Sequence, residues 1–378
     1  MTTTTERPAD TSEARMPEQR ADASGRRPAL LGTVRGRYAV AAIGLVLAVG
    51  ATFLLDPYRN YLLSLTAAYV CATAGLTMLV GRTGQLSLGH AAFMATGAYA
   101  FALTSNGLAE AGIEGPVLLL APFLVAVVAA TAFGTLVGAA GARLHGPYLA
   151  GLTLAIVLAL PAVTSTFSGL LGGDQGLYVQ TERRPEVLST VIANEQWQAW
   201  VALVAAAIVL VLLAQLGRSP SGIRMQAVRD DTAAARLSGI DPFRVKVQAF
   251  AISAGAAGLG GAVLAYVTQA ASPGAYGLAF SLFLLVAIVV GGTGTLPGAV
   301  WGALLLVLLP EAIAAVTETL PLPDDAVSRL DGNLAVLIFG ALLVVIMIAA
   351  PRGIQGALVA LRGRIRSRTT RTTRTTST

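Results

Sequence analysis

Three polar side chains stand close together in an otherwise apolar part of the sequence. The stretch reads "GQLSLGHAAFMATGAYA", residues 84–100, and contains Gln85, Ser87 and His90. An amide, a hydroxyl and an imidazole can all form hydrogen bonds, so these side chains could line or gate a hydrated passage. Four glycines, which weaken a helix, break up the same region: Gly81, Gly84, Gly89 and Gly97.

The same residues also have a purely structural interpretation. Glycines let helices approach each other closely inside a membrane, and Ser87 could be the N-cap of a helix. The sequence leaves both interpretations open. If His90 lines a passage, we expect it to donate a hydrogen bond rather than to carry protons.

A weak internal sequence repeat indicates a second candidate segment for the pathway. The sequence "VGRTGQL" at 80–86 returns as "VGGTGTL" at 290–296. Two glycine-interrupted segments in separate halves of a transporter are a pointer to its pathway. Thr293 and Thr295 therefore join the three polar residues as candidate pathway residues. Elsewhere, Gly258 and Gly261 lie among alanines, a pattern that suits tight helix contacts.

Residue patterns that would support catalysis are missing. The sequence has no HExxH or GxSxG motif, and its two histidines, His90 and His145, lie in different segments. A phosphate-binding loop needs a lysine after glycines, but the one lysine is Lys246, in "DPFRVKVQAF". We therefore predict that the chain is not an enzyme, with no catalytic residues, metal site or cofactor of its own.

Ionisable side chains are also rare in the apolar runs, which contain only His90 and Glu311. Ion-coupled transporters usually keep such groups within the membrane. Proton coupling is therefore disfavoured, although sodium can be held by backbone carbonyls and hydroxyls. If ATP drives this chain, a partner must bind it.

The elements that position these residues are predicted to be membrane-spanning helices. Of the 378 residues, 55% are hydrophobic and 12% are charged, and the mean hydropathy is +0.70. Roughly 30 Å of hydrocarbon requires about 20 apolar residues in a helix. We therefore predict an all-α polytopic membrane protein with about ten transmembrane helices. The apolar runs lie near 38–55, 60–80, 86–104, 116–141, 147–165, 198–216, 248–271, 279–292, 297–316 and 333–350.

Two of these regions, 86–104 and 279–298, are short or rich in glycine. They could be broken or re-entrant, which a membrane permits only where protein or water covers the backbone. The expected number of transmembrane helices is therefore eight to ten.

Basic residues predict the orientation, because Lys and Arg collect on the cytoplasmic side. With both termini cytoplasmic, all but four basic residues fall inside. The exceptions are Arg59, Arg183, Arg184 and Arg329. Both termini are therefore expected to be cytoplasmic.

The chain divides into a transmembrane domain, 38–350, and two tails. Residues 1–37 are polar and read as a disordered cytoplasmic tail. The basic cytoplasmic tail, 351–378, could touch anionic membrane lipid or be merely solvated, and we expect no nucleic acid partner. The single cysteine, Cys71, cannot form an internal disulfide.

The longest cytoplasmic loop between spans, 217–247, is more than a connector. Helix-favouring residues run from Ile223 to Leu237, and Gly239 follows as a stop signal. One helix over this range would place Ile223, Ala227, Ala234 and Leu237 on or near one side, which suits a helix lying outside the bilayer against something. A basic loop that only follows the positive-inside rule is the alternative.

Three segments in order resemble a known family. They are "VGRTGQLSLGHAAFMATGAYA", "AVRDDTAAARLSGIDPFRVKVQAFAISAGAAGLGGAVLAY" and "SLFLLVAIVVGGTGTLPGAVWGA". The chain is similar to branched-chain amino acid ABC transporter permeases, above all to the longer, LivM-type subunit, over roughly 40–350.

The resemblance implies a bacterial inner-membrane, multi-pass importer subunit with several partners. These are a second, homologous permease, two cytoplasmic ATP-binding subunits that bind the ATP, and an extracytoplasmic solute-binding protein. The implied substrates are leucine, isoleucine and valine. Urea or short amides are the alternative within the family, and an ion-coupled secondary transporter or a passive channel is the alternative outside it.

The resemblance also implies that loop 217–247 docks on an ATPase. Ala234, Ala235 and Gly239 match the pattern of the coupling loop, with Arg229 just before it, but Thr232 stands where a glutamate is usual. Asp231, next to it, could replace that charge or be unrelated. On the other side, loop 166–197 could meet the binding protein through Asp174, Glu182, Arg183 and Arg184, or be an ordinary exposed loop.

Overall fold

The computed structural model describes residues 34–144, 147–181, 192–319, 340–341 and 353–360. The chain separates into two units, Met1–Val40 and Ala41–Thr378, and the second contains nearly all described residues. Within the described residues the structure is helical apart from two strands of two residues each. The helical part of the predicted fold class is therefore confirmed.

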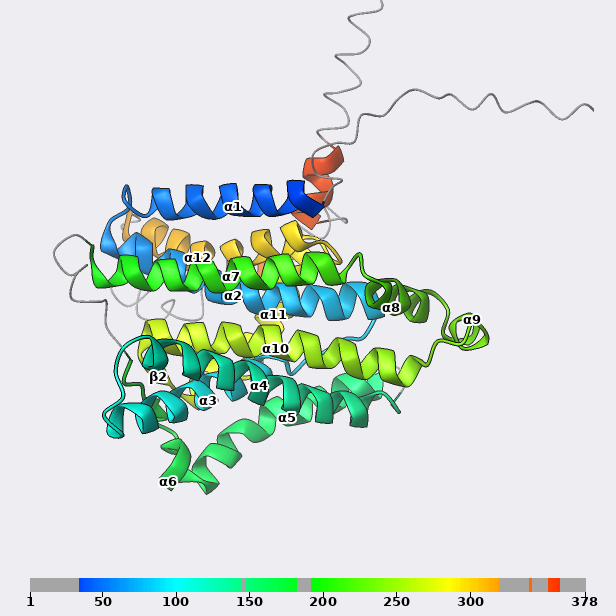
Figure 1. Cartoon of the computed structure of the whole chain (residues 1–378), viewed down its shortest axis with the longest axis horizontal. Helices are drawn as coiled ribbons and strands as arrows, with labels where there is room; N and C mark the ends of the chain where they lie inside the picture. The colour runs from blue at the N-terminus through cyan, green and yellow to red at the C-terminus, as the bar shows by residue number, and fades with distance from the viewer. Residues whose placement is uncertain (1–33, 145–146, 182–191, 320–339, 342–352, 361–378) are drawn as a thin grey trace, which may run out of the picture. The chain divides into compact units, whose positions relative to one another are not determined.

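The elements follow the predicted apolar runs closely (Figure 1). The helices are α1 (Val34–Ala51), α2 (Pro57–Thr83), α3 (His90–Glu110), α4 (Pro116–Gly141), α5 (Pro147–Thr166), α6 (Ser168–Leu171), α7 (Asn194–Leu216), α8 (Pro220–Asp230), α9 (Thr232–Leu237), α10 (Pro242–Thr268), the 3₁₀ turn η3 (Pro273–Tyr276), α11 (Leu278–Gly291) and α12 (Leu296–Thr319). The strands are β1 (Leu177–Tyr178) and β2 (Ala270–Ala271), which pair antiparallel.

Six of the described helices are long and apolar enough to cross a membrane. They are Pro57–Thr83, Pro116–Gly141, Tyr148–Thr166, Asn194–Leu216, Pro242–Thr268 and Pro273–Gly291. Two shorter apolar helices, Ala42–Ala51 and Leu296–Ala312, accompany them. The predicted run 333–350 falls largely outside the described residues, so about ten spans remains a prediction.

Helices α10 and α2 form the centre of the bundle. In their most apolar windows 83% of α10 and 78% of α2 is buried, against 22% of α5 and 28% of α4. α10 packs against α2, α3 and α4, while α7 and α12 cover α2. Within the described residues the outer helices thus leave large apolar faces uncovered, which lipid or another chain can contact.

Glycines make the central packing close. A Cβ atom on Gly258 would overlap that of Ala130 on α4, and one on Gly97 of α3 would overlap the backbone of Gly258 itself. On the next turn of α10, a Cβ on Gly261 would overlap the carbonyl oxygen of Met94. The predicted role of Gly258 in tight helix contacts is confirmed.

Local sequence signals set several helix starts. Asp56, Ser219 and Asp241 each precede a proline and accept a hydrogen bond from a backbone N–H of the first turn. Proline is well suited to the first helical position, because its missing N–H would have no partner there. These signals begin α2, α8 and α10.

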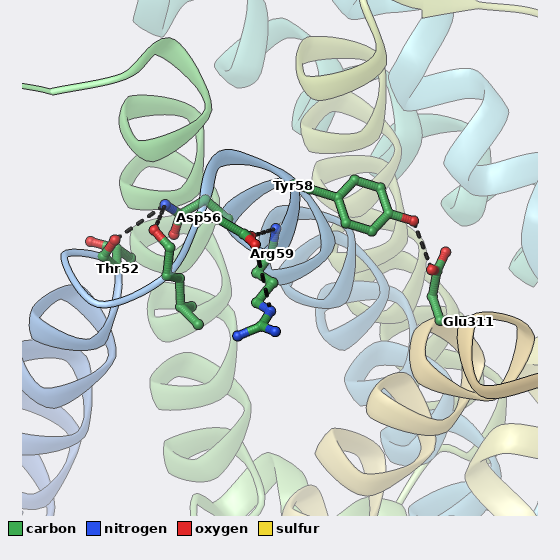
Figure 2. Close-up of polar contacts among 7 residues, drawn as sticks. Thr52, Asp56, Tyr58, Arg59 and Glu311 are labelled. Carbon is green, nitrogen blue, oxygen red and sulfur yellow. Dashed lines mark hydrogen bonds and ion pairs between the residues drawn. The ribbon is translucent and has the colours of Figure 1, made fainter. Parts of the chain in front are cut away.

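At the start of α2, side chains tie three helices together. Tyr58 donates a hydrogen bond to Glu311 of α12, at 2.7 Å. Figure 2 shows this contact, and Arg59 beside Asp56. Asn60 donates to the Thr52 carbonyl, and Trp200 of α7 donates to the Thr52 hydroxyl. Glu311, one of the two ionisable residues of the apolar runs, is therefore a surface partner of Tyr58.

Candidate functional site

The polar stretch that begins at Gly84 is a non-helical link between two buried helices. α2 ends at Thr83, and Gly84 adopts a left-handed conformation with φ 68° while its N–H bonds to the Val80 carbonyl. Glycine reaches this conformation without a Cβ penalty. A Cβ atom on Gly89 would overlap the Thr153 carbonyl of α5, so the link is held tightly against a third helix.

Gln85, Ser87 and His90 are all buried, with exposed fractions of 5%, 0% and 0%. Among the described residues the Gln85 amide nitrogen, the Ser87 hydroxyl and both His90 ring nitrogens have no hydrogen-bond partner of standard geometry. The His90 ring makes an edge contact with Phe93, with centroids 5.7 Å apart. An unpaired buried polar group costs about 1–3 kcal/mol, so polarity here is not explained by packing alone.

The N-cap role considered for Ser87 is wrong. α3 begins at His90, with Gly89 in the N-cap position and no side-chain cap. The backbone N–H of Ala91 instead donates to Ser281 of α11, at 3.4 Å, and that of Leu88 donates to Thr153, at 3.0 Å. Partners from distant helices replace a local cap.

Ser281 and Thr153 were missed by the sequence reasoning. Each is a buried hydroxyl, 0% and 1% exposed, inside an apolar helix. A lone hydroxyl in an apolar run is the signal that could have singled them out, but the sequence does not say which loop it would meet.

The second glycine-rich segment forms the turn between α11 and α12. Gly292 and Gly294 have φ of 120° and 79°. The Thr295 hydroxyl donates to the Gly292 carbonyl, at 3.0 Å, and accepts from the Gly298 N–H, at 3.2 Å. Thr295 therefore caps α12, and Thr293 is exposed.

The two echoing segments meet in space. A Cβ atom on Gly81 would overlap the Cα of Gly294, so these two backbones lie in direct contact. In the described part of the chain no hydrogen bond joins Thr293 or Thr295 to the three buried polar residues. The structure thus brings glycines of the two repeated segments into contact, but it does not bring their polar side chains together.

The predicted single helix from Ile223 to Leu237 is wrong. α8 ends at Asp230 and α9 starts at Thr232, because Asp231 between them is extended, with φ −153°. The Asp231 carboxylate accepts from the N–H groups of Ala233 and Ala234, at 2.8 and 3.0 Å. Aspartate is a favoured N-cap residue, so it starts a new helix here.

The two short helices present apolar side chains to the surroundings. Met225 and Val228 of α8 are buried against the long helices, but Ile223 is 63% exposed and Leu237 of α9 is 92% exposed. Figure 1 shows α9 beyond one end of the long helices. An exposed leucine and isoleucine in this position are typical of a surface that another protein covers.

The remaining residues of this segment have distinct places. Ala235 is buried and Ala234 is exposed, while the Thr232 hydroxyl donates to the Val228 carbonyl at 3.0 Å. Gly239 ends α9 with φ 77°, and a Cβ atom added there would meet nothing within 4 Å.

α8 is attached to the end of α2 by two arginines. Arg229 donates to the Gly81 carbonyl, and its side chain lies against Gly84. Arg82 donates to the Gln226 side chain at 3.3 Å. The surface helix is therefore bonded directly to the residues that precede the buried polar link.

The opposite loop, 166–197, contains α6 and β1. Its inner part is held to α3, because Asn106 donates to the Tyr178 carbonyl and accepts from the Gln180 N–H, both at 2.8 Å. Asp174 is exposed. The other charged candidates, Glu182, Arg183 and Arg184, lie outside the described residues.

Comparison with known proteins gives a consistent result. Residues 58–347 match the family described as "Branched-chain amino acid transport system / permease component". The high-affinity branched-chain amino acid transport system permease protein LivM of Escherichia coli (strain K12) is 29% identical over 353 residues, which cover 86% of this chain and 77% of LivM.

Two further relatives carry similar names. LivH of the same strain is 25% identical over 301 residues, covering 78% of this chain and 92% of LivH. A probable LivM of Methanocaldococcus jannaschii is 23% identical, covering 68% of this chain and 73% of its own length. No solved structure matches the chain significantly.

Proposed function

The chain belongs to the branched-chain amino acid transport permease family, and we propose that it is a membrane-spanning subunit of an ATP-driven importer. Its substrates are leucine, isoleucine and valine, the class named for its relatives LivM and LivH. It lies in the bacterial inner membrane with about ten spans. Both termini, including the tails 1–37 and 351–378, are cytoplasmic.

The observation that carries this proposal is the pair α8 and α9. A short, partly basic helix pair lies at one end of the bundle, with Ile223 and Leu237 exposed and Arg229 bonded inward. This arrangement offers a partner an apolar contact on the outside and a firm connection to the long helices on the inside. The partner is a cytoplasmic ATPase that docks on loop 217–247 through Ala234, Gly239 and their neighbours.

An external energy source is needed because the chain has little to harvest energy with. Its one lysine, Lys246, does not follow a glycine-rich loop, as phosphate binding would require. The two ionisable residues of the apolar runs are a buried His90 and a surface Glu311 bonded to Tyr58. Two ATP-binding subunits, a second permease and a solute-binding protein at loop 166–197 complete the importer.

The candidate pathway residues lie close to the contact between α8 and the end of α2. Gln85, Ser87 and His90 are buried, and several of their polar atoms have no hydrogen-bond partner in the described part of the chain. These atoms gain hydrogen bonds when the link opens to water or to a polar solute, and Thr293 and Thr295 lie at the exposed turn that touches Gly81.

Transport competition tests the substrate class. Cells that lack their own branched-chain amino acid uptake receive the complete importer, and labelled leucine uptake is measured with unlabelled competitors. Excess isoleucine or valine should abolish the uptake, whereas urea and acetamide should leave it unchanged. Competition by urea or acetamide alone would assign the importer to the alternative substrates.

A further inference from the structure

Arg229 completes the end of α2. The last carbonyls of an α-helix have no partner within the helix, and the Gly84 N–H satisfies only that of Val80. The Arg229 guanidinium donates to the next carbonyl, that of Gly81. A cation at a helix C-terminus also interacts favourably with the helix dipole, and hydrogen bonds to charged donors are the stronger kind.

Gly81 also makes a second contact, through its Cα rather than its carbonyl. A Cβ atom there would overlap the Cα of Gly294, in the turn between α11 and α12. Gly81 thus accepts a hydrogen bond from Arg229 of α8 and also packs against the turn before α12. Four residues later in the chain is Gln85, which lies in the non-helical link between α2 and α3 (residues 84–89).

The covalent route from α8 into the bundle bypasses this junction. α8 follows α7 directly, and α9 leads into α10; neither connection includes residues 81–90 or 292–295. The segments that directly precede and follow α8 therefore do not include the two glycine-rich segments, and α8 meets the end of α2 through non-covalent contacts. The side-chain bonds from α8 to the end of α2 are Arg229 to Gly81 and Arg82 to Gln226.

We propose that Arg229 is a positioning residue that makes the end of α2 and the α11–α12 turn follow α8. The proposal rests on the proposed function, because it assumes that an ATPase moves α8. Arg229 holds α8 to Gly81, and Gly81 in turn pushes against Gly294. Movement of α8 thereby moves the link between α2 and α3, residues 84–89, together with the turn before α12.

The test compares Arg229→Gln with Arg224→Gln in the complete importer reconstituted into vesicles. Arg224 is exposed on the same helix and forms no hydrogen bond or ion pair in the described residues, so it controls for the lost charge. ATP hydrolysis and labelled leucine uptake are measured in the same vesicles. The ratio of ATP hydrolysed to leucine taken up should rise about tenfold in Arg229→Gln, as expected for the loss of one charge-assisted bond.

Control variants distinguish a failure of the proposed role of Arg229 from a failure of the proposed function. Arg224→Gln removes a charge from the same docking segment but leaves the bond to Gly81 in place, so hydrolysis and uptake should change together and the ratio should keep its wild-type value. Arg229→Lys, which retains a cationic donor, should recover part of the coupling. An unchanged ratio in Arg229→Gln would overturn the role of Arg229. Wild-type vesicles without ATP-driven uptake would instead refute the proposed function.

A second measurement covers the case in which Arg229→Gln does not assemble. Spin labels are placed at exposed positions in a Cys71→Ala background, by Arg224→Cys on α8 and Leu86→Cys on the link. Their distance should stay constant between the nucleotide-free and ATP-bound importer. A change of about one helical turn, roughly 5 Å, would show that α8 moves independently and would overturn the proposal.

Discussion

Gly97 lies where α3 touches α10, and a Cβ atom there would overlap the backbone of Gly258. Gly107, two to three turns further along α3, would meet nothing within 4 Å. The two positions share a helix, so they separate the effect of packing from that of helix propensity.

Gly97→Ala should destabilise the folded chain by about 1–3 kcal/mol, because overpacking forces the two backbones apart. Gly107→Ala should be neutral or stabilising by up to about 1 kcal/mol, since alanine favours helix over glycine. Thermal unfolding of the purified chain in detergent measures both. Equal stability of the two variants would show that the α3–α10 contact does not depend on glycine.

The proposed pathway predicts how accessible Ser87 is. The residue is 0% exposed in this structure, so a thiol there should react only when the link opens. Ser87→Cys in a Cys71→Ala background should be modified by small water-soluble thiol reagents during ATP turnover, about tenfold faster than without ATP. Complete protection in every transport state would leave Ser87 with a structural role alone.

For single residues, the sequence predicted the kind of interaction better than the residue with which it is made. The glycine at 258 implied a close helix contact, because few other reasons place glycine in an alanine-rich helix. Ser87 was a plausible cap, but its helix starts three residues later, and the Ala91 N–H at the helix start donates to Ser281 of α11. Which distant hydroxyl meets a loop depends on tertiary packing, which spacing along the chain does not encode.

At the scale of elements, hydropathy located the helices well. The run 116–141 matches α4, and 147–165 differs from α5 by one residue. The single helix expected over 223–237 was wrong, because helix-favouring composition hid a break at Asp231. An aspartate can occupy a helix interior or cap a new helix, and in the structure Asp231 caps α9.

Gly239 tests whether the end of α9 is a docking surface. Its φ of 77° disfavours alanine by about 1 kcal/mol, whereas asparagine tolerates this conformation better. Among the described residues nothing lies within 4 Å of a Cβ atom at this position, so we expect added bulk to affect a partner. If the ATPase docks here, Gly239→Asn should reduce ATP-coupled uptake more than Gly239→Ala, with membrane insertion unchanged.

The opposite order, with alanine more harmful than asparagine, would mean that backbone strain matters and bulk does not. Uptake and ATP hydrolysis in the reconstituted importer give the order directly. Wild-type activity in both variants would contradict docking at this position.

At the scale of the whole molecule, the charge pattern and the packing agree on one end of the bundle. Arg82 contacts α8, and Arg143 lies over the ring of Phe243 at the start of α10, 6.0 Å from its centroid. Arg82, Arg143 and loop 217–247, three of the basic sites that the sequence assigned to the cytoplasm, therefore lie at contacts with α8 and the start of α10. The free faces of the outer helices are also in keeping with a second permease, whose position no sequence pattern reveals.

The central claim is that this chain moves solute only when a partner supplies the energy. Labelled leucine accumulation is measured in vesicles that contain the chain alone or the complete importer, with and without ATP. We predict accumulation above the external concentration only with all subunits and ATP. Accumulation by the chain alone under a sodium or pH gradient would contradict the account.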